Sequence, residues 1–362
     1  MLIVTLEQLR RNGRKRRMFL LALCAWVGYV SYRLRSAASE QVFPHRGKRY
    51  LIVNPISGLG NRLRATCSAA VLAERMRREL IIVWLPDVHL DANMSDLFDT
   101  SGLSVLNQDI YEQLSPDNTI SYDFDTLPQV PIRGHYASYI YVKSAFRLNG
   151  EGKKLHVTEA AFKRCIRKLR PNRVVEELHG RLRSATQLRA KTVGVHVRML
   201  GELELDVPDL NRVPAEKQHI EPGIQNIVRY ERAKCNASFF KKPMKRLSLH
   251  EDVHFFVSLD SLEAWSTLNR MSNEFSISLL NEASFAMCNT GMRRSAFCAQ
   301  HALAEMLTLS DMDYFLYSSW SSFSEIISAM RVGDKQSSIL GCATDDVMMA
   351  DMFAQVMKKP LV

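Results

Sequence analysis

The chain has 362 residues, of which 46% are hydrophobic and 24% charged, with a formal net charge of +10. This composition excludes an intrinsically disordered protein, and the length predicts two domains. Residues 1–49 hold 11 Lys and Arg against two acidic residues, so the rest of the chain carries 37 basic and 36 acidic groups. A body this close to neutral argues against a nucleic-acid partner bound along one basic face.

The first 48 residues read as a membrane anchor. Residues 1–17 form a basic tail, and the run 18–32 carries no charge. The run is short for a membrane span, but aromatic residues inside it and arginines on both sides extend it. We expect a signal-anchor helix at 18–32, a stem at 33–48, and a lumenal body in the Golgi or another secretory-pathway membrane. A cleaved signal peptide and an amphipathic helix remain alternatives.

A glycine-rich segment follows the first expected strand of the body. The strand is 50–53, the glycine turn is 58–64 (Gly-Leu-Gly-Asn-Arg-Leu-Arg), the helix is 61–78, and a second strand is 80–85. This order predicts a βαβ unit. Such a turn presents free N–H groups and the positive end of a helix dipole beside two arginines, which favours an anion. The candidate binding residues are Gly58, Gly60, Asn61 and Arg62.

The glycine turn is not a dinucleotide loop. Leu63 stands where the third glycine of that motif belongs, and Asp87 is the nearest candidate for the acid expected about 20 residues on. The motif of a P-loop is absent from the turn as well. A plain turn with solvated arginines remains the alternative to an anion site.

The middle of the chain divides the body. Residues 86–150 are rich in Pro, Asp, Asn and Ser and are expected to form loops around a cleft, and a helical stretch follows at 159–189, interrupted at Pro171. We expect an N-terminal Rossmann-like domain at 49–190 and a C-terminal one at 191–345, followed by a tail at 346–362. Alternating strands and helices in both halves predict an α/β fold with parallel sheets.

Polar side chains close two strands of the second half. His196 and Arg198 end the strand 192–198, and Ser258 and Asp260 lie at the carboxyl end of the next strand, 253–258. Ligands of open α/β sheets bind at the carboxyl ends of strands, and arginine there suits a diphosphate. A strand-end ion pair with a core histidine is the alternative interpretation.

A third polar group, the serine turn 318–323, follows the helix 295–310 and the strand 314–317. Its hydroxyl and N–H groups suit phosphate or ribose. The alternative is an ordinary helix N-cap with Trp320 in the core. The candidate residues are Ser318, Ser319, Ser321, Ser322 and Phe323.

The cysteines and sequons are compatible with a lumenal body. Cys288 and Cys298 are the best local disulfide pair, whereas the apolar helix around Cys67 predicts simple packing of that thiol. Asn93 and Asn236 begin glycosylation sequons.

Three segments in this order resemble the fucosyltransferase superfamily. They are the glycine turn 58–64, the strand end Val195-His-Val-Arg198, and the run Ala302-Leu-Ala-Glu-Met that leads into the serine turn 318–323. The superfamily includes plant α1,2-, core α1,6- and protein O-fucosyltransferases, and the resemblance covers roughly residues 50–330. The last segment is most similar to the plant group and the His-Val-Arg strand to the α1,6 group.

The resemblance implies a GT-B fold, in which two Rossmann-like domains face each other across a cleft. It also implies a metal-independent, inverting enzyme with GDP-fucose as donor. The family's arginine for the β-phosphate corresponds to Arg198, and its glycine loop and serine-rich turn correspond to 58–64 and 318–323. The α1,6 group continues with a second arginine, where this chain has Met199. That difference argues against an N-glycan-core acceptor.

The expected function is therefore fucosyl transfer by a type II membrane protein to a hydroxyl of a glycan or glycoprotein. In the α1,6 group an acid lies eight positions after the strand-end arginine, and this position is Asp206. We expect Asp206 as the catalytic base, although a loosely bonded transition state needs no dedicated base. A glycosyltransferase for another nucleotide sugar and an inactive glycan-binding relative remain alternatives.

Overall fold

The computed structural model describes residues 47–124, 130–134, 136–187, 191–198, 235–249, 253–279, 288, 294–319, 321–333 and 339–341. The expected membrane span at 18–32, the tail at 346–362 and Asp206 lie outside these residues. Among the helices that the structure does describe, none combines the length and the apolar character needed to cross a bilayer.

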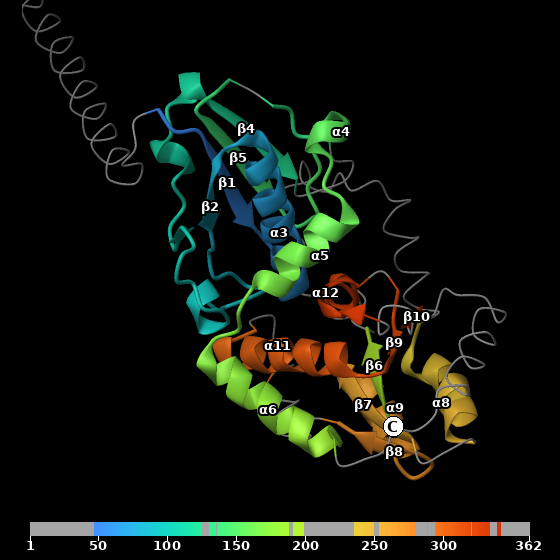
Figure 1. Cartoon of the computed structure of the whole chain (residues 1–362). Coiled ribbons are helices and arrows are strands. Elements are labelled where there is room, and N and C mark those ends of the chain that lie inside the picture. Colours follow the sequence, from blue (N-terminus) through green and yellow to red (C-terminus); the bar gives the residue numbers. More distant parts are fainter. Residues whose placement is uncertain are drawn as a thin grey trace, which may run out of the picture.

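Two parallel sheets form the body, one in each half of the chain (Figure 1). The first has the order β3-β2-β1-β5-β4 and the second the order β10-β9-β6-β7-β8. The strands are β1 (Tyr50–Pro55), β2 (Glu79–Val83), β3 (Val105–Leu106), β4 (Thr119–Phe124), β5 (Tyr139–Ser144), β6 (Lys191–Val197), β7 (Val253–Leu259), β8 (Ser276–Ser278), β9 (Tyr314–Tyr317) and β10 (Ile339–Gly341). The expected α/β class with a parallel sheet in each half is confirmed.

The central strands β1 and β7 are buried along almost their whole length because both faces of each sheet are covered. Every residue of β1 is buried, and β7 is buried up to its last residue. Such continuous burial is typical of parallel sheets with helices on both sides. The helices are α3 (Leu59–Met76), α4 (Gly152–Leu155), α5 (Glu159–Lys168), α6 (Arg173–Gln187), α8 (Lys241–Ser248), α9 (Leu262–Met271), α11 (Ala296–Asp311) and α12 (Ser322–Met330).

The region 86–150 is not the set of loops that its composition suggests. It contains β3, β4 and β5, and β5 lies beside β1 in the middle of the first sheet. A short 3-10 helix at Met94–Asp96 precedes β3, and two more, at Tyr111–Gln113 and Pro116–Asn118, separate β3 from β4. The polar and proline residues of this region thus belong to the connections, while each strand is only two to six residues long.

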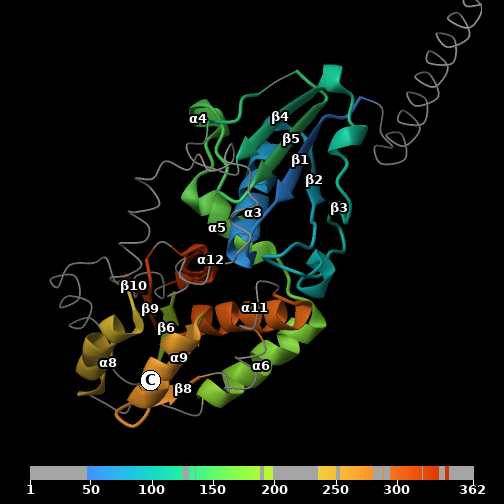
Figure 2. The same ribbon diagram turned by 180° about the vertical axis from the view of Figure 1, so that it is seen from behind.

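The two halves exchange helices. α6, which precedes the expected boundary at residue 190, packs along α11 beside the second sheet, and α12 of the second half packs on α3 and α5 (Figures 1 and 2). One buried apolar cluster runs through the contact and includes Leu63, Leu303 and Ile326, each with no exposed surface. An interface this apolar fixes the two halves relative to each other.

Two disulfides join cysteines within the described residues. Cys288–Cys298 confirms the local pair expected before α11. The second, Cys67–Cys165, connects α3 to α5 across 98 residues of sequence, so the expectation that Cys67 is a free packing thiol is wrong. The sequence does not distinguish a disulfide-bonded cysteine on an apolar helix face from a free one, because both are buried like small apolar side chains.

Candidate active site

The carboxyl ends of β1, β6, β7 and β9 meet between the two sheets, as parallel α/β sheets predict. The glycine turn approaches the start of α12 there. A Cβ on Gly60 would lie 2.7 Å from the carbonyl carbon of Ser322 and 2.8 Å from the nitrogen of Phe323. Only glycine fits at this distance, so the structure brings the glycine turn and the serine turn directly together.

The backbone at the start of the glycine turn is strained. Ser57 has φ +72°, a left-handed conformation that non-glycine residues rarely adopt. Asn61 Nδ2 donates to Ser57 Oγ at 2.8 Å and holds this conformation. Gly58 is the N-cap residue of α3, and the cap carries no side-chain hydrogen bond. Backbone N–H groups at a helix start attract anions.

Arg62 points into the protein interior and away from solvent. Its side chain is fully buried, its guanidinium donates to the carbonyl oxygens of Ser57 and Leu85, and Nη2 lies 2.7 Å from Asp87 Oδ2. The group also lies over the Trp84 ring. Burial lowers the pKa of Arg62, and the charge of Asp87 opposes that shift. The expected phosphate-binding role therefore finds no support in the position of Arg62, which holds β1, β2 and α3 together.

Arg64, the second arginine of the turn, contacts the other half of the molecule. Its Nη1 lies 3.3 Å from Glu325 Oε2 of α12, while Nε donates to the carbonyl oxygen of Ala145 at 2.8 Å. Both contacts are partly buried. Arg64 thus links the two halves directly behind the glycine turn.

Arg198 lies at the end of β6 and remains partly exposed. Its Nη1 lies 2.5 Å from Asp260 Oδ2, and the two side chains are 25% and 11% exposed. The backbone N–H of Arg198 donates to the buried hydroxyl of Ser318 at 2.9 Å, and that hydroxyl donates to the carbonyl oxygen of Cys235. Of the predicted residues, Ser318 and Asp260 therefore position Arg198, one through the backbone and one through the guanidinium.

A second arginine, Arg294, lies beside this pair and was not foreseen. Its Nη1 is 3.9 Å from where a Cβ of Gly58 would stand. Burial lowers the pKa of Arg294, the charge of Arg198 lowers it further, and the charge of Asp260 opposes both. Arg198, Asp260 and Arg294, here called the arginine–aspartate cluster, thus combine two positive charges with one negative charge next to Gly58. This net positive group is suited to an anion.

The backbone of Arg294 is held from three sides. Its carbonyl oxygen accepts the N–H of Asp91 at 2.8 Å, and Asp91 forms a bridge with Ser295. Ser295 caps α11, and the Cys288–Cys298 disulfide encloses the segment. No sequence motif identifies Arg294 as a candidate, because it precedes a helix that the sequence predicts only from its apolar pattern.

His196 is a buried neutral group. Nδ1 lies 2.8 Å from Ser324 Oγ, and the ring stacks on Phe323 at 4.6 Å between centroids. Burial lowers the pKa of His196 to about 3, and the Arg198 charge contributes to the shift, while Asp260 opposes it. The contacts of His196 and Phe323 join β6 to α12, so these two predicted residues support the site from within.

Ser258 has a similar internal role. Its hydroxyl donates to Glu305 Oε2 at 2.5 Å, and both residues are buried. Burial raises the pKa of Glu305 to about 7, which the hydrogen bond from Ser258 opposes. Glu305 was not foreseen as part of this region, although the Ala302-Leu-Ala-Glu-Met segment contains it.

The rest of the serine turn begins α12. Ser321 is the N-cap and accepts the N–H of Ser324, which agrees with the simple capping interpretation of this residue. Ser319 and Ser322 are half-buried, and Trp320 lies outside the described residues. Within the part of the chain that the structure describes, no cluster of His, Cys, Asp or Glu has the form of a metal site.

No family model matches this chain. No curated protein sequence matches it either. Among solved structures, the NodZ α1,6-fucosyltransferase soaked with GDP-fucose superposes with a TM-score of 0.50 and 16% identity, over 78% of this chain and 93% of that chain. NodZ from Bradyrhizobium in selenomethionine form gives a TM-score of 0.50 and 15% identity, over 78% and 92%. The fold is therefore similar to that of a fucosyltransferase, as the three sequence segments predict.

Proposed function

We propose that this chain transfers fucose from GDP-fucose to a hydroxyl of a glycan or glycoprotein, with inversion at the anomeric carbon and without a metal ion. The arginine–aspartate cluster beside Gly58 carries the proposal. It presents Arg198 at the carboxyl end of β6 and Arg294 close to Gly58, the N-cap residue of α3, where the cap makes no side-chain hydrogen bond. The fold shared with NodZ supports the same assignment.

Arg198 is the residue that we assign to the departing GDP. When the bond from fucose to the diphosphate breaks, negative charge grows on the β-phosphate oxygen. A guanidinium already in place stabilises this charge more in the transition state than in the ground state. Asp260 prevents Arg198 from adopting other rotamers, and Ser318 fixes its backbone.

Arg294 and the glycine turn complete the donor site in this proposal. Arg294 approaches Gly58 from the second half, so a diphosphate bound there receives charge from Arg294 and N–H groups from the start of α3. Gly60 contributes by allowing this approach of α12 rather than by contact. Arg294 thus supplies a second arginine from another segment, whereas the α1,6 group has one directly after its strand-end arginine.

The acceptor side of the proposal rests on sequence. Asp206 is proposed as the base that takes the acceptor proton, and it lies outside the described residues. A type II topology with residues 18–32 in a Golgi membrane is likewise proposed from the basic tail and the uncharged run. A lumenal location agrees with the disulfides Cys67–Cys165 and Cys288–Cys298 of the described residues.

Calorimetric titration of the full chain with GDP and UDP tests the donor assignment, followed by detection of fucose release or transfer from GDP-fucose. We expect GDP to bind and UDP to bind at least about 10-fold more weakly, and Arg294→Ala to weaken GDP binding about 10-fold. Arg173→Ala, an exposed arginine of α6, is the control. Equal binding of GDP and UDP contradicts a guanine-specific donor site, and binding without turnover favours a glycan-binding relative.

A further inference from the structure

The Cys288–Cys298 disulfide encloses one of the two arginines of the candidate site. The two cysteines are 10 positions apart in sequence, and Arg294 lies between them. Cys298 belongs to the first turn of α11 and is 8% exposed, whereas Cys288 is half-buried. The same helix is fixed in the core by Ala299 and Leu303. The disulfide therefore attaches the chain before Arg294 to a helix start that is itself well anchored.

The position of Arg294 requires support from the protein. Its Nη1 lies 3.9 Å from where a Cβ of Gly58 would stand, and burial and the charge of Arg198 both lower the pKa of Arg294. Because like charges repel, an unsupported Arg294 would turn toward water, which screens the repulsion. The N–H of Asp91 contributes one hydrogen bond to the Arg294 carbonyl oxygen, at 2.8 Å. The disulfide adds a covalent limit to the conformations that the backbone of this segment can adopt.

A second disulfide, Cys67–Cys165, has a different setting. It joins α3 to α5, two helices that already pack on each other, and Cys67 has no exposed surface. Its cysteines are 98 positions apart, so it closes a far longer loop than Cys288–Cys298 does. A cross-link that closes a long loop in the core contributes mainly to the stability of the fold. The molecule thus offers its own comparison for a disulfide next to the candidate donor site.

We propose that the Cys288–Cys298 disulfide is a positioning element of the donor site, which holds Arg294 beside Gly58 where the diphosphate binds. The inference rests on the proposed function, because the site that Arg294 completes is the proposed one. A loop that is already fixed in its bound conformation spares the free energy of ordering it when the ligand arrives. The disulfide therefore acts on the affinity for the donor more than on the stability of the fold.

Calorimetric titration of the full chain with GDP tests this role in the Cys288→Ser/Cys298→Ser double variant. We expect the affinity for GDP to fall about 10-fold, the effect of ordering one long side chain on binding. The Tm should fall less than in Cys67→Ala/Cys165→Ala, because the closed loop is shorter. The Cys67→Ala/Cys165→Ala variant should in turn keep its affinity for GDP within about twofold.

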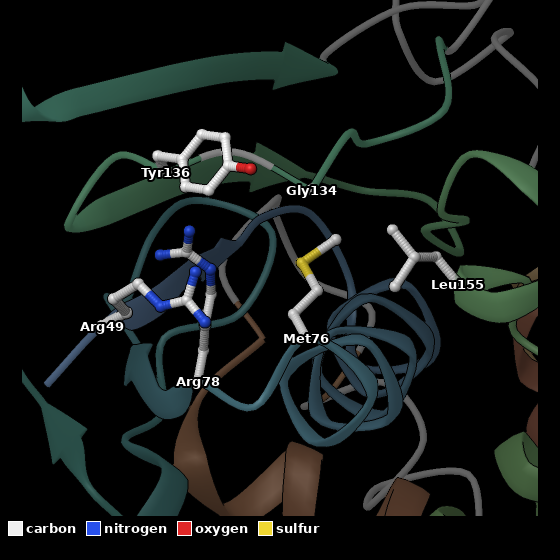
Figure 3. A pocket seen from close by; sticks show the side chains of 6 residues that line it. All are labelled: Arg49, Met76, Arg78, Gly134, Tyr136 and Leu155. Atoms are coloured by element: carbon white, nitrogen blue, oxygen red, sulfur yellow. The ribbon is translucent and has the colours of Figure 1, made fainter.

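The loss of affinity should depend on Arg294. In an Arg294→Ala chain, removal of the disulfide should weaken GDP binding no further, because the side chain that the disulfide positions is gone. Arg49→Ala is the matched control, since it removes the same charge from an exposed residue that directly precedes β1. Arg49 lines a separate cavity of about 230 Å³ at the amino ends of β1 and β2 (Figure 3). In an Arg49→Ala chain the disulfide should matter as much as in the wild type.

Reduction of the folded chain gives the same comparison without a substitution. A thiolate of dithiothreitol attacks one sulfur of the disulfide, and the other cysteine leaves as a thiolate. The second thiol of the reagent then closes its ring, which yields two protein thiols and oxidised dithiothreitol. Cys298 is suited to leave, because the Ser295 hydroxyl donates to its Sγ at 3.4 Å and the start of α11 stabilises a thiolate. Alkylation with iodoacetamide and mass spectrometry identify which cysteines have been reduced.

Unchanged affinity for GDP in Cys288→Ser/Cys298→Ser overturns the proposal, and so does an equal loss with and without Arg294. A fall in Tm as large as that of Cys67→Ala/Cys165→Ala shows a structural role instead and overturns it too. If the double variant does not fold, the reduced wild-type chain is judged by the same criteria. A wild-type chain that fails to bind GDP contradicts the donor assignment itself, whereas normal GDP binding without the disulfide contradicts only its positioning role.

Discussion

The glycine turn and the end of β6 lie on opposite sides of one site, and both carry arginine. In the turn, Arg62 is fully buried among carbonyl oxygens and Asp87. At the strand end, Arg198 is a quarter exposed and pairs with Asp260, and the charges of both act on Arg294. The motif therefore predicts where the candidate site lies, while burial and the number of partners decide which arginine we propose as the ligand-binding one.

Replacing Arg62 should have the largest effect, and it should be on stability. Arg62→Met leaves Asp87 and two carbonyl oxygens without their partner, which should cost about 3 kcal/mol of unfolding free energy. Urea unfolding measures it, with Arg173→Met on exposed α6 as a control that changes stability by less than about 0.5 kcal/mol. An unchanged unfolding free energy in Arg62→Met would show that the buried Arg62–Asp87 pair does not stabilise the fold. It would also restore Arg62 as a candidate for ligand binding.

Replacing Arg198 should instead affect turnover. Arg198→Gln should lower kcat for GDP-fucose about 10²–10³-fold, the usual loss on removing one donor to a developing negative charge. Its stability should change by only about 1 kcal/mol, since Asp260 retains the nearby charge of Arg294. Arg198→Lys keeps the charge without the planar guanidinium, so its kcat should lie between those of the wild type and Arg198→Gln. Full activity in Arg198→Gln would remove Arg198 from the mechanism.

Gly60→Ala tests the contact between the two sides. The added methyl group would meet the backbone of Ser322 and Phe323 below 3 Å, so we expect a loss of about 1–3 kcal/mol and a lower Tm. Gly180→Ala is the matched control, because nothing lies within 4 Å of its Cβ position in α6. That variant should gain up to about 1 kcal/mol from helix propensity. Equal Tm values in both variants would contradict the close approach of α12.

The smallest effect concerns the pH dependence of stability. The pKa of Glu305 is raised from 4.5 to about 7 in the folded chain, so the folded state holds the extra proton between these values. Stability from this group therefore falls as the pH rises from about 4.5 to about 7. Glu305→Gln should remove that slope, at most about 1.4 kcal/mol per pH unit, and keep an acceptor for Ser258.

His196 changes the stability with pH in the opposite direction to Glu305, which makes the effect of Glu305→Gln easier to measure. Its pKa falls from 6.5 to about 3 on folding, so its contribution is present above pH 6.5 and is lost as the pH falls toward 3. With Glu305 replaced, stability should therefore rise more steeply between pH 4.5 and 6.5 than in the wild type. Glu263→Gln, on the exposed side of α9, should leave the curve unchanged. Parallel curves for wild type and Glu305→Gln would contradict the buried proton.

Sequence patterns predicted the long elements well and the charged partners poorly. The strand at 314–317 has the predicted bounds, and the helix predicted at 295–310 is α11 (Ala296–Asp311), because apolar pattern alone marks them. β3, β4 and β5 were hidden, since short strands among prolines and aspartates carry little periodic signal. Arg62 and Arg64 look alike in sequence, and only packing assigns one to its own domain and the other to α12.

In the candidate site, too, some residues could be predicted from the sequence and others could not. Arg198 and Asp260 form an ion pair at the ends of neighbouring strands, as a parallel fold predicts, whereas His196, Ser258 and Ser318 are internal supports. Arg294 escaped prediction because its position depends on a bridge to Asp91, some 200 residues away in sequence. Such a pairing follows from tertiary structure alone.

The Cys67–Cys165 cross-link makes most of the first sheet a closed ring of chain. β2, β3, β4 and β5 all lie between the two cysteines, whereas β1 lies outside them. A protease cut anywhere in that ring would leave both fragments covalently attached, so the nicked protein would migrate as one band until a reductant is added. Gels run with and without reductant would therefore give different pictures of the integrity of the same sample.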